Sequence, residues 1–180
     1  MAKFISDGTM SSDKAAVHLF TAEISDALLA DERQRNLYRV WLAACERSGQ
    51  SVPARADINI TELRECIGNL LMLQVEDGGR DFRHLVHGTQ VARHYGQDLT
   101  GKRITDIPKD SSETLLEFYR AVYRERSPYF SRMNANLIFF VDTIERFMLP
   151  LTNGGDDVSR IIVGCYPLSF RRKPDQFLSE

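Results

Sequence analysis

The sequence lacks an excess of charge of either sign. Lysines and arginines number 23, aspartates and glutamates number 25, and the formal net charge is −2. A general nucleic-acid binder presents a basic surface that neutralises phosphate groups, so the balanced composition argues against this class of protein. Long apolar runs are also missing, because no stretch approaches the roughly 18 apolar residues that span a bilayer as a helix.

Cysteine is scarce and does not occur in closely spaced pairs. The chain has three cysteines, Cys45, Cys66 and Cys165, and no C-x-x-C spacing. An odd number without such spacing argues against a disulfide framework and against a zinc ribbon. The N-terminal stretch MAKFISDGTMSSDK has no apolar core run, so it does not resemble a signal peptide. We therefore expect a cytoplasmic protein.

Motifs of common enzymes are absent as well. The sequence has no G-x-S-x-G nucleophile elbow, no P-loop and no G-x-G-x-x-G fingerprint. Cys165 stands inside the apolar run IIVGCYPL, where a small core residue is the simplest interpretation. We expect no catalytic residues and no enzyme activity.

The patterns that are present predict one globular domain, since 43% of the 180 residues are apolar. Two helices are predicted first, over residues 12–29 and 31–47. In the second, Trp41 is expected to be a buried anchor within an apolar stripe, which also contains Leu37, Val40, Ala44 and Cys45.

Shorter elements follow along the chain. A short helix is expected near residues 59–70, where Ile60, Leu63, Ile67 and Leu70 share a face. The turn signal DGGR between two apolar runs predicts a hairpin over residues 70–88. SSETLLEFYRAVYRER is predicted to be a helix that Pro128 ends. Three strands are expected over residues 129–140, 143–151 and 159–168, followed by an exposed tail.

This order of elements predicts an α+β fold with a five-stranded antiparallel sheet. In the strand of residues 143–151, Phe147, Leu149 and Leu151 share one face, whereas Ile144 and Met148 share the other. Apolar residues on both faces indicate a sheet that is covered on both sides. One face is expected to carry the helices of the domain. The N-terminal helices are expected either to cover the other face or to form a homodimer interface.

The element order and local sequence resemble the PAS family, in particular a bacterial branch of short stand-alone proteins. The matching stretches are LYRVW from Leu37, PARADINI from Pro53, FRHLVHGT from Phe82 and YGQDLTGK from Tyr95. The chain departs from the family pattern at residues 59–61, where Asp-Pro is usual, and near residues 67–68, where Leu-Pro is usual. The resemblance covers about residues 37–170.

The resemblance implies a non-enzymatic sensory or regulatory module in bacterial signal transduction, which binds a small ligand, a protein partner or both. Residues 1–12 are expected to be a flexible N-terminus, residues 13–50 to hold the N-terminal helices, residues 51–170 to form the PAS-like domain and residues 171–180 to form the tail. Interaction with an unidentified signalling protein and homodimerisation through the N-terminal helices are expected, without nucleic acid and without membrane insertion. The alternative is a protein-interaction or dimerisation adaptor that has no ligand.

The cofactors of PAS relatives are not expected here. Flavin-binding relatives carry a reactive cysteine in an N-C-R-F-L-type run, and this chain has VARHYGQDLTG instead. Haem-binding relatives commonly use a histidine on the longer helix, which has none here, so His94 on the short helix is the residual candidate. His84 and His87 have an odd separation, so on a regular strand they face opposite sides and do not converge on one metal ion.

A small-ligand site between the sheet and its helices is therefore the candidate site. Its expected lining consists of His84, Tyr95, Phe118, Tyr119, Tyr123, Met133 and Met148. Methionine and aromatic side chains line small-ligand pockets, but at helical spacing they also form ordinary core, and His84 is open to either interpretation. Arg83, Arg93 and Arg132 are candidates for an anion partner or for solvated surface residues.

Overall fold

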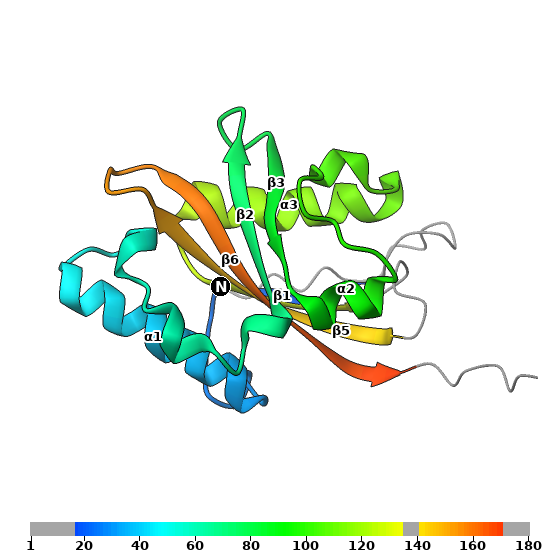
Figure 1. Ribbon diagram of the computed structural model, residues 1–180, viewed down its shortest axis with the longest axis horizontal. Coiled ribbons are helices and arrows are strands. Elements are labelled where there is room, and N and C mark those ends of the chain that lie inside the picture. Colours follow the sequence, from blue (N-terminus) through cyan, green and yellow to red (C-terminus); the bar gives the residue numbers. More distant parts are fainter. Residues whose placement is uncertain (1–16, 135–140, 171–180) are drawn as a thin grey trace, which may run out of the picture.

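The centre of the protein is a six-stranded antiparallel sheet, with strands in the order β1-β4-β5-β6-β2-β3 (Figure 1). The structure is a computed structural model, and it describes residues 17–134 and 141–170. The strands are β1 (Val17–Thr21), β2 (Leu70–Glu76), β3 (Asp81–His87), β4 (Tyr129–Asn134), β5 (Val141–Thr152) and β6 (Val158–Phe170).

Three α-helices accompany the sheet within the described residues: α1 (Glu32–Ser48), α2 (Thr89–Tyr95) and α3 (Lys109–Glu125). Four short 3₁₀ turns connect the elements: η1 (Arg55–Asp57), η2 (Ile60–Leu63), η3 (Ile67–Asn69) and η4 (Ile104–Asp106). Helix α1 begins after Asp31, whose carboxylate accepts a hydrogen bond from the Arg33 backbone at 2.8 Å. It ends at Gly49, whose φ of 67° suits glycine. No helix in the described parts of the chain has the length and apolar character needed to cross a membrane.

The sheet is covered on both faces, as the strand pattern predicts. On one face, α2 and α3 pack against Ile144 and Met148 of β5. On the other face, α1 packs against Phe147 and Leu149 of the same strand. In Figure 1, α3 passes behind β2 and β3. The prediction that a lead-in helix covers the second face is therefore confirmed for α1.

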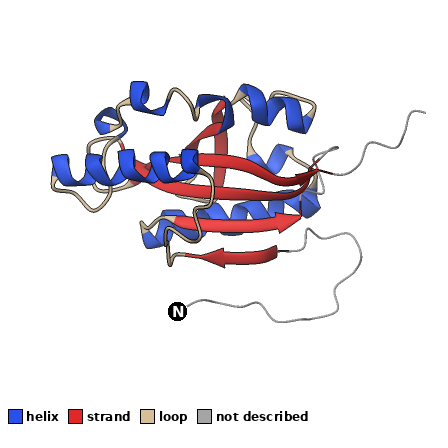
Figure 2. Ribbon diagram, turned by 90° about the horizontal axis from the view of Figure 1, so that it is seen from below, coloured by secondary structure: helices blue, strands red, loops and turns tan. Residues whose placement is uncertain are grey.

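Strand β1 replaces part of a predicted helix. The expected helix over residues 12–29 is wrong for its described part, because Val17–Thr21 pairs antiparallel with β4. Figure 2 shows β1 as the outermost strand, beside β4. The segment VHLFT is rich in β-branched and aromatic residues, and β4 would otherwise be an unpaired edge. Pairing at this edge outweighs the weak helical pattern and gives six strands instead of five.

Two other predictions differ in detail from the structure. The expected helix near residues 59–70 consists of the turns η2 and η3, and Ile60 and Ile67 of its predicted apolar face are exposed. The strand expected over residues 129–140 is described only as far as Asn134. Residues 135–140, the N-terminus up to residue 16 and the predicted tail over 171–180 lie outside the described residues.

Candidate functional site

A cluster of buried polar side chains lies on the face of the sheet that α2 and α3 cover. We call it the polar cluster. Every member is 8% exposed or less. The members are His84 and His87 of β3, Tyr95 of α2, Tyr119 of α3, Arg146 of β5 and Cys165 of β6.

Arg146 is the only charged member of the polar cluster. Its neighbours in the alternation of β5, Ile144 and Met148, both pack on the α3 side, so Arg146 points to that side as well. One terminal nitrogen, Nη2, donates a hydrogen bond to the Tyr95 hydroxyl at 2.8 Å. The other two nitrogens, Nε and Nη1, are buried and have no hydrogen-bond partner among the described residues.

The side chains around Arg146 do not compensate its charge. Arginine stays protonated in proteins. Burial raises the pKa of the Tyr119 hydroxyl and raises the pKa of the Cys165 thiol to about 11, so both groups are neutral at pH 7. In the described ranges, no carboxylate forms an ion pair with Arg146. An uncompensated buried charge costs several kcal/mol of stability, roughly, after relaxation of the surroundings.

His84 and His87 lie on the same face of the sheet. In the ladder between β2 and β3, His87 is opposite Leu71 and His84 is opposite Leu73, with a register shift between them. Leu85 is therefore an extra residue in β3, a β-bulge. The two rings meet edge to face, with centroids 5.5 Å apart. The prediction that these histidines face opposite sides is wrong, because the bulge changes the alternation by one residue.

Both histidines are neutral at pH 7. Burial lowers the pKa of His84, and the nearby Lys102 backbone opposes this shift. The His84 ring nitrogen Nδ1 donates to the Lys102 carbonyl at 3.1 Å. Burial, together with the neighbouring His84, lowers the pKa of His87 to about 4. Neither ring nitrogen of His87 has a hydrogen-bond partner among the residues described, although the Asp98 carboxylate lies 3.8 Å from Nδ1.

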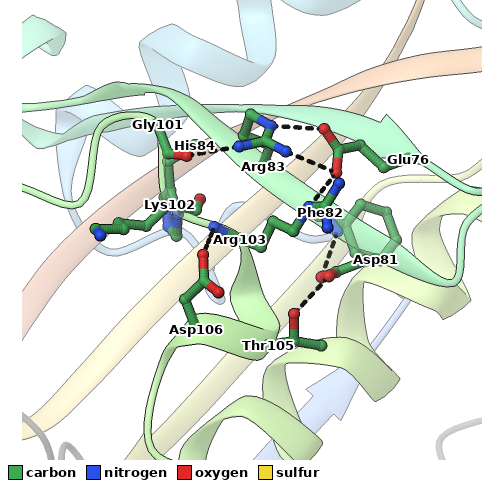
Figure 3. A network of polar contacts seen from close by, with 10 residues as sticks. All are labelled: Glu76, Asp81, Phe82, Arg83, His84, Gly101, Lys102, Arg103, Thr105 and Asp106. Carbon is green, nitrogen blue, oxygen red and sulfur yellow. Dashed lines mark hydrogen bonds and ion pairs between the residues drawn. The ribbon is translucent and has the colours of Figure 1, made fainter.

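The loop after α2 is fastened to β3 by a polar network (Figure 3). The His84 backbone N–H donates to the Lys102 carbonyl at 2.9 Å. Glu76, at the end of β2, forms ion pairs with Arg83 at 2.6 Å and with Arg103 at 2.7 Å. These contacts hold the Lys102 carbonyl in place, and this carbonyl orients the His84 ring.

The residues predicted to line the site divide into two groups and one outlier. His84, Tyr95 and Tyr119 belong to the polar cluster. Phe118, Met133 and Met148 are buried in the adjoining apolar core, where Phe118 stacks on Phe20 of β1 with ring centroids 4.4 Å apart. Tyr123 is half-buried and lies over the β2–β3 turn. Its ring is so close to Gly79 that a Cβ atom at this position would clash with it.

The three arginines expected as candidates for an anion partner lie outside the polar cluster, and Arg146 was not among them. Arg83 is paired with Glu76, Arg93 is exposed, and Arg132 is paired with Glu145 at 2.6 Å on the α1 side of the sheet. The missing signal was present in the strand alternation. Ile144 and Met148 share one face of the strand, and the same alternation puts Arg146 between them on that face.

In the described parts of the chain, no group of three or more histidine, cysteine, aspartate or glutamate side chains is arranged to hold a metal ion. His94 lies in the last turn of α2 and is half-buried.

A second feature is an open cleft of about 560 Å³ next to α1. It lies between α1 and the η2 region, outside the core that contains the polar cluster. Its lining is strongly charged and consists of Glu32, Arg33, Arg35, Asn36, Arg39, Thr61, Glu62, Arg64 and Glu65.

Comparison with known proteins agrees with this architecture. Searches of curated proteins and of solved structures gave no significant match. A family model described as PAS domain matches residues 30–166, a span that begins just before α1 and ends within β6. The match includes both helical layers and all members of the polar cluster. The chain therefore belongs to the PAS domain family.

Proposed function

We propose that the chain is a non-enzymatic sensory or regulatory PAS module that binds a small ligand between the sheet and helices α2 and α3. The observation that carries this proposal is Arg146, a buried cation with two unpartnered nitrogens. Buried polar groups are normally hydrogen-bonded, so unsatisfied donors that point into a core are typical of a binding site. PAS domains are generally sensory, which supports a role in signal transduction.

The proposed site retains most of the residues expected from the sequence. We assign its polar contacts to His84, Tyr95 and Tyr119, and we add Arg146 and His87 to them. Phe118, Met133 and Met148 supply the apolar lining in the same core. Tyr123 is assigned to packing on the β2–β3 turn.

Two polar contacts connect the site region to α1 on the opposite face of the sheet. Glu145, next to Arg146 in β5, accepts a hydrogen bond from Gln34 of α1 at 3.1 Å. We infer that a shift of β5 on ligand binding changes this contact and thereby α1.

The second contact runs through β6. Asn69 donates to the backbone carbonyl of Cys165 at 2.9 Å and accepts from Arg33 of α1 at 3.1 Å. Cys165 pairs with Arg146 in the ladder between β5 and β6. The charged cleft beside α1 is then the proposed surface for a signalling protein.

Native mass spectrometry of the purified full chain, followed by a thermal-shift screen of small metabolites, tests ligand binding. The proposal expects a bound small molecule, or a compound that raises the melting temperature. It also expects this compound to protect amides of β5 and α2 from hydrogen exchange. A screen in which no compound has either effect would contradict it.

The alternative is an adaptor that dimerises or binds a protein without a ligand. Exposed Leu42 on α1, together with exposed Ile60, which precedes Thr61 of the cleft lining, favours a contact surface on this side. Light scattering of the full chain distinguishes the two functions. A dimer that Leu42→Glu dissociates, in a protein that binds no compound, favours the adaptor.

The proposal includes the cellular compartment and the type of pathway in which the chain acts. The three cysteines are free in the structure, which supports a reducing compartment such as the cytoplasm. The resemblance to the bacterial PAS branch supports a bacterial signalling pathway.

A further inference from the structure

We propose that the ligand is a small monocarboxylate with an apolar tail, and that Arg146 and Tyr95 bind its carboxylate. This inference rests on the proposed function, because it requires that a small molecule enters the core beside the polar cluster. It adds the chemical class of the ligand and the residues that recognise it.

The charge balance of the site calls for a single negative charge. Arg146 is 3% exposed, and none of the described carboxylates is paired with it. Cys165 and Tyr119 are neutral because burial raises the pKa of each. One monoanion would neutralise the guanidinium and remove the cost of leaving it unpaired.

The donors of the site match a carboxylate. Nε and Nη1 of Arg146 carry N–H groups that no described residue accepts. Since Nη2 of Arg146 donates to the Tyr95 oxygen, the hydroxyl proton of Tyr95 is left to donate to a ligand. Hydrogen bonds from a guanidinium to a carboxylate are among the strong ones in proteins.

His87 adds a further donor near Tyr95. The two rings meet at 80° with centroids 5.5 Å apart. A neutral imidazole has one N–H donor and one acceptor, and both nitrogens of His87 lack a partner in the described part of the chain. The imidazole can therefore donate to a ligand oxygen without adding a second positive charge.

The surroundings of Arg146 favour an apolar tail and disfavour a phosphate. Ile144 and Met148 flank Arg146 on the same face of β5, and Val163 lies on the same side of β6. Arg146 is the only lysine or arginine in the polar cluster. A phosphate group carries nearly two negative charges at pH 7, so one cation would leave it partly uncompensated in a buried site.

Isothermal titration of the full chain tests the assignment. The probes are the sodium salts of acetate, butanoate and hexanoate, the neutral amide of each, and inorganic phosphate. The proposal expects at least one carboxylate to bind while its amide binds about tenfold more weakly or not at all. Phosphate is expected to bind more weakly than that carboxylate.

Three variants locate the binding site. Arg146→Met is expected to abolish carboxylate binding, and Tyr95→Phe is expected to weaken it about threefold to tenfold, because one hydrogen bond is lost. Arg93→Met is the matched control, because it removes an exposed arginine of α2 that lies outside the polar cluster, and it should keep the wild-type affinity. If Arg146→Met does not fold, Tyr95→Phe and the ¹⁵N shift of the Arg146 Nε–H group on titration give the same information.

The outcomes separate this inference from the proposed function. If a carboxylate and its amide bind equally, or if Arg146→Met binds as tightly as the wild type, the carboxylate assignment is wrong while ligand binding in the core stands. Tighter binding of phosphate than of every carboxylate also overturns the assignment. If no carboxylate binds but the metabolite screen finds a neutral ligand, only this inference fails. If neither experiment finds a ligand, both fail.

Discussion

Glu145 and Arg146 are consecutive residues of β5 that are buried on opposite faces of the sheet, and only Glu145 has an ionic partner among the described residues. Their exposed fractions are 1% and 3%. Glu145 accepts hydrogen bonds from Arg132 at 2.6 and 3.0 Å and from Gln34 at 3.1 Å. Arg146 donates to the neutral hydroxyl of Tyr95. A buried charge without compensation destabilises a fold, and destabilising features of this kind are typical of functional sites.

The first prediction concerns the stability of the ligand-free protein. Arg146→Met should raise the free energy of unfolding by about 1–2 kcal/mol, because an apolar side chain of similar length replaces an uncompensated buried cation. Urea denaturation at pH 7, followed by circular dichroism, measures the change. Glu145→Gln is the matched comparison and should lower the free energy of unfolding by about 1–3 kcal/mol, since it removes a satisfied charged acceptor. A loss of about 3–5 kcal/mol in Arg146→Met would instead show that Arg146 belongs to a structural pair.

The parts of the fold that the sequence predicts correctly are those with local signals. The apolar stripe around Trp41 predicts α1, and the DGGR turn predicts the β2–β3 hairpin. In this turn Gly78 and Gly79 have φ of 63° and 81°, a conformation that suits glycine. Periodicity and turn residues act within a few positions of the chain, so one sequence is enough to find them.

The parts that the sequence does not predict depend on distant partners. Strand β1 forms because the edge of β4, more than a hundred residues away, pairs with it. The bulge at Leu85 is a mismatch between the registers of two strands, and residue types alone do not reveal it. It is also what brings His87 into the polar cluster. Of the polar cluster, His84, Tyr95 and Tyr119 were expected from the sequence, and His87 was not, because of the bulge. Arg146 was missed although the alternation of β5 places it between Ile144 and Met148. That these residues bind a ligand stays a prediction.

The second prediction concerns Gly88, between β3 and α2. A Cβ atom there would lie 2.5 Å from the Gly68 carbonyl oxygen and 2.7 Å from that of Leu70. Because both obstacles are backbone atoms, Gly88→Ala should lower the free energy of unfolding by about 2–3 kcal/mol. Gly155→Ala is the control, since a Cβ atom there meets nothing within 4 Å. Equal stabilities of the two variants, measured by urea denaturation, would mean that the close approach at Gly88 is absent in solution.

The third prediction concerns the packing of α1 on the sheet. Trp41 is 4% exposed, and its indole N–H donates to the Pro150 carbonyl at 2.8 Å. Trp41→Ala should therefore cost about 3–5 kcal/mol of stability. Leu42→Ala, at the next position and 39% exposed, should change stability by less than about 0.5 kcal/mol. Thermal denaturation that shows similar melting temperatures for Trp41→Ala and Leu42→Ala would exclude the packing of α1 described above.

The last prediction concerns acid. A histidine in the unfolded chain has a pKa near 6.5, whereas burial lowers the pKa of His87 in the folded chain to about 4. Between these pH values the unfolded chain binds more protons than the folded chain, so stability must fall as the pH decreases from about 7 to 4. This difference in pKa corresponds to a loss of about 3 kcal/mol of stability. The pKa of about 4 already includes the Asp98 carboxylate, 3.8 Å from Nδ1, which favours the protonated ring and limits the decrease.

Urea denaturation at several pH values between 4 and 7.5 measures this loss. His87→Gln keeps a neutral polar side chain that does not titrate, so it should flatten the dependence on pH. The exposed His18, which bonds the Asn134 side chain at 2.7 Å, provides the control, and His18→Gln should leave the dependence close to that of the wild type. If His87→Gln loses stability toward pH 4 as steeply as the wild type, the burial of His87 does not cause the acid sensitivity, and the unpartnered imidazole beside Tyr95 must already be hydrogen-bonded in solution.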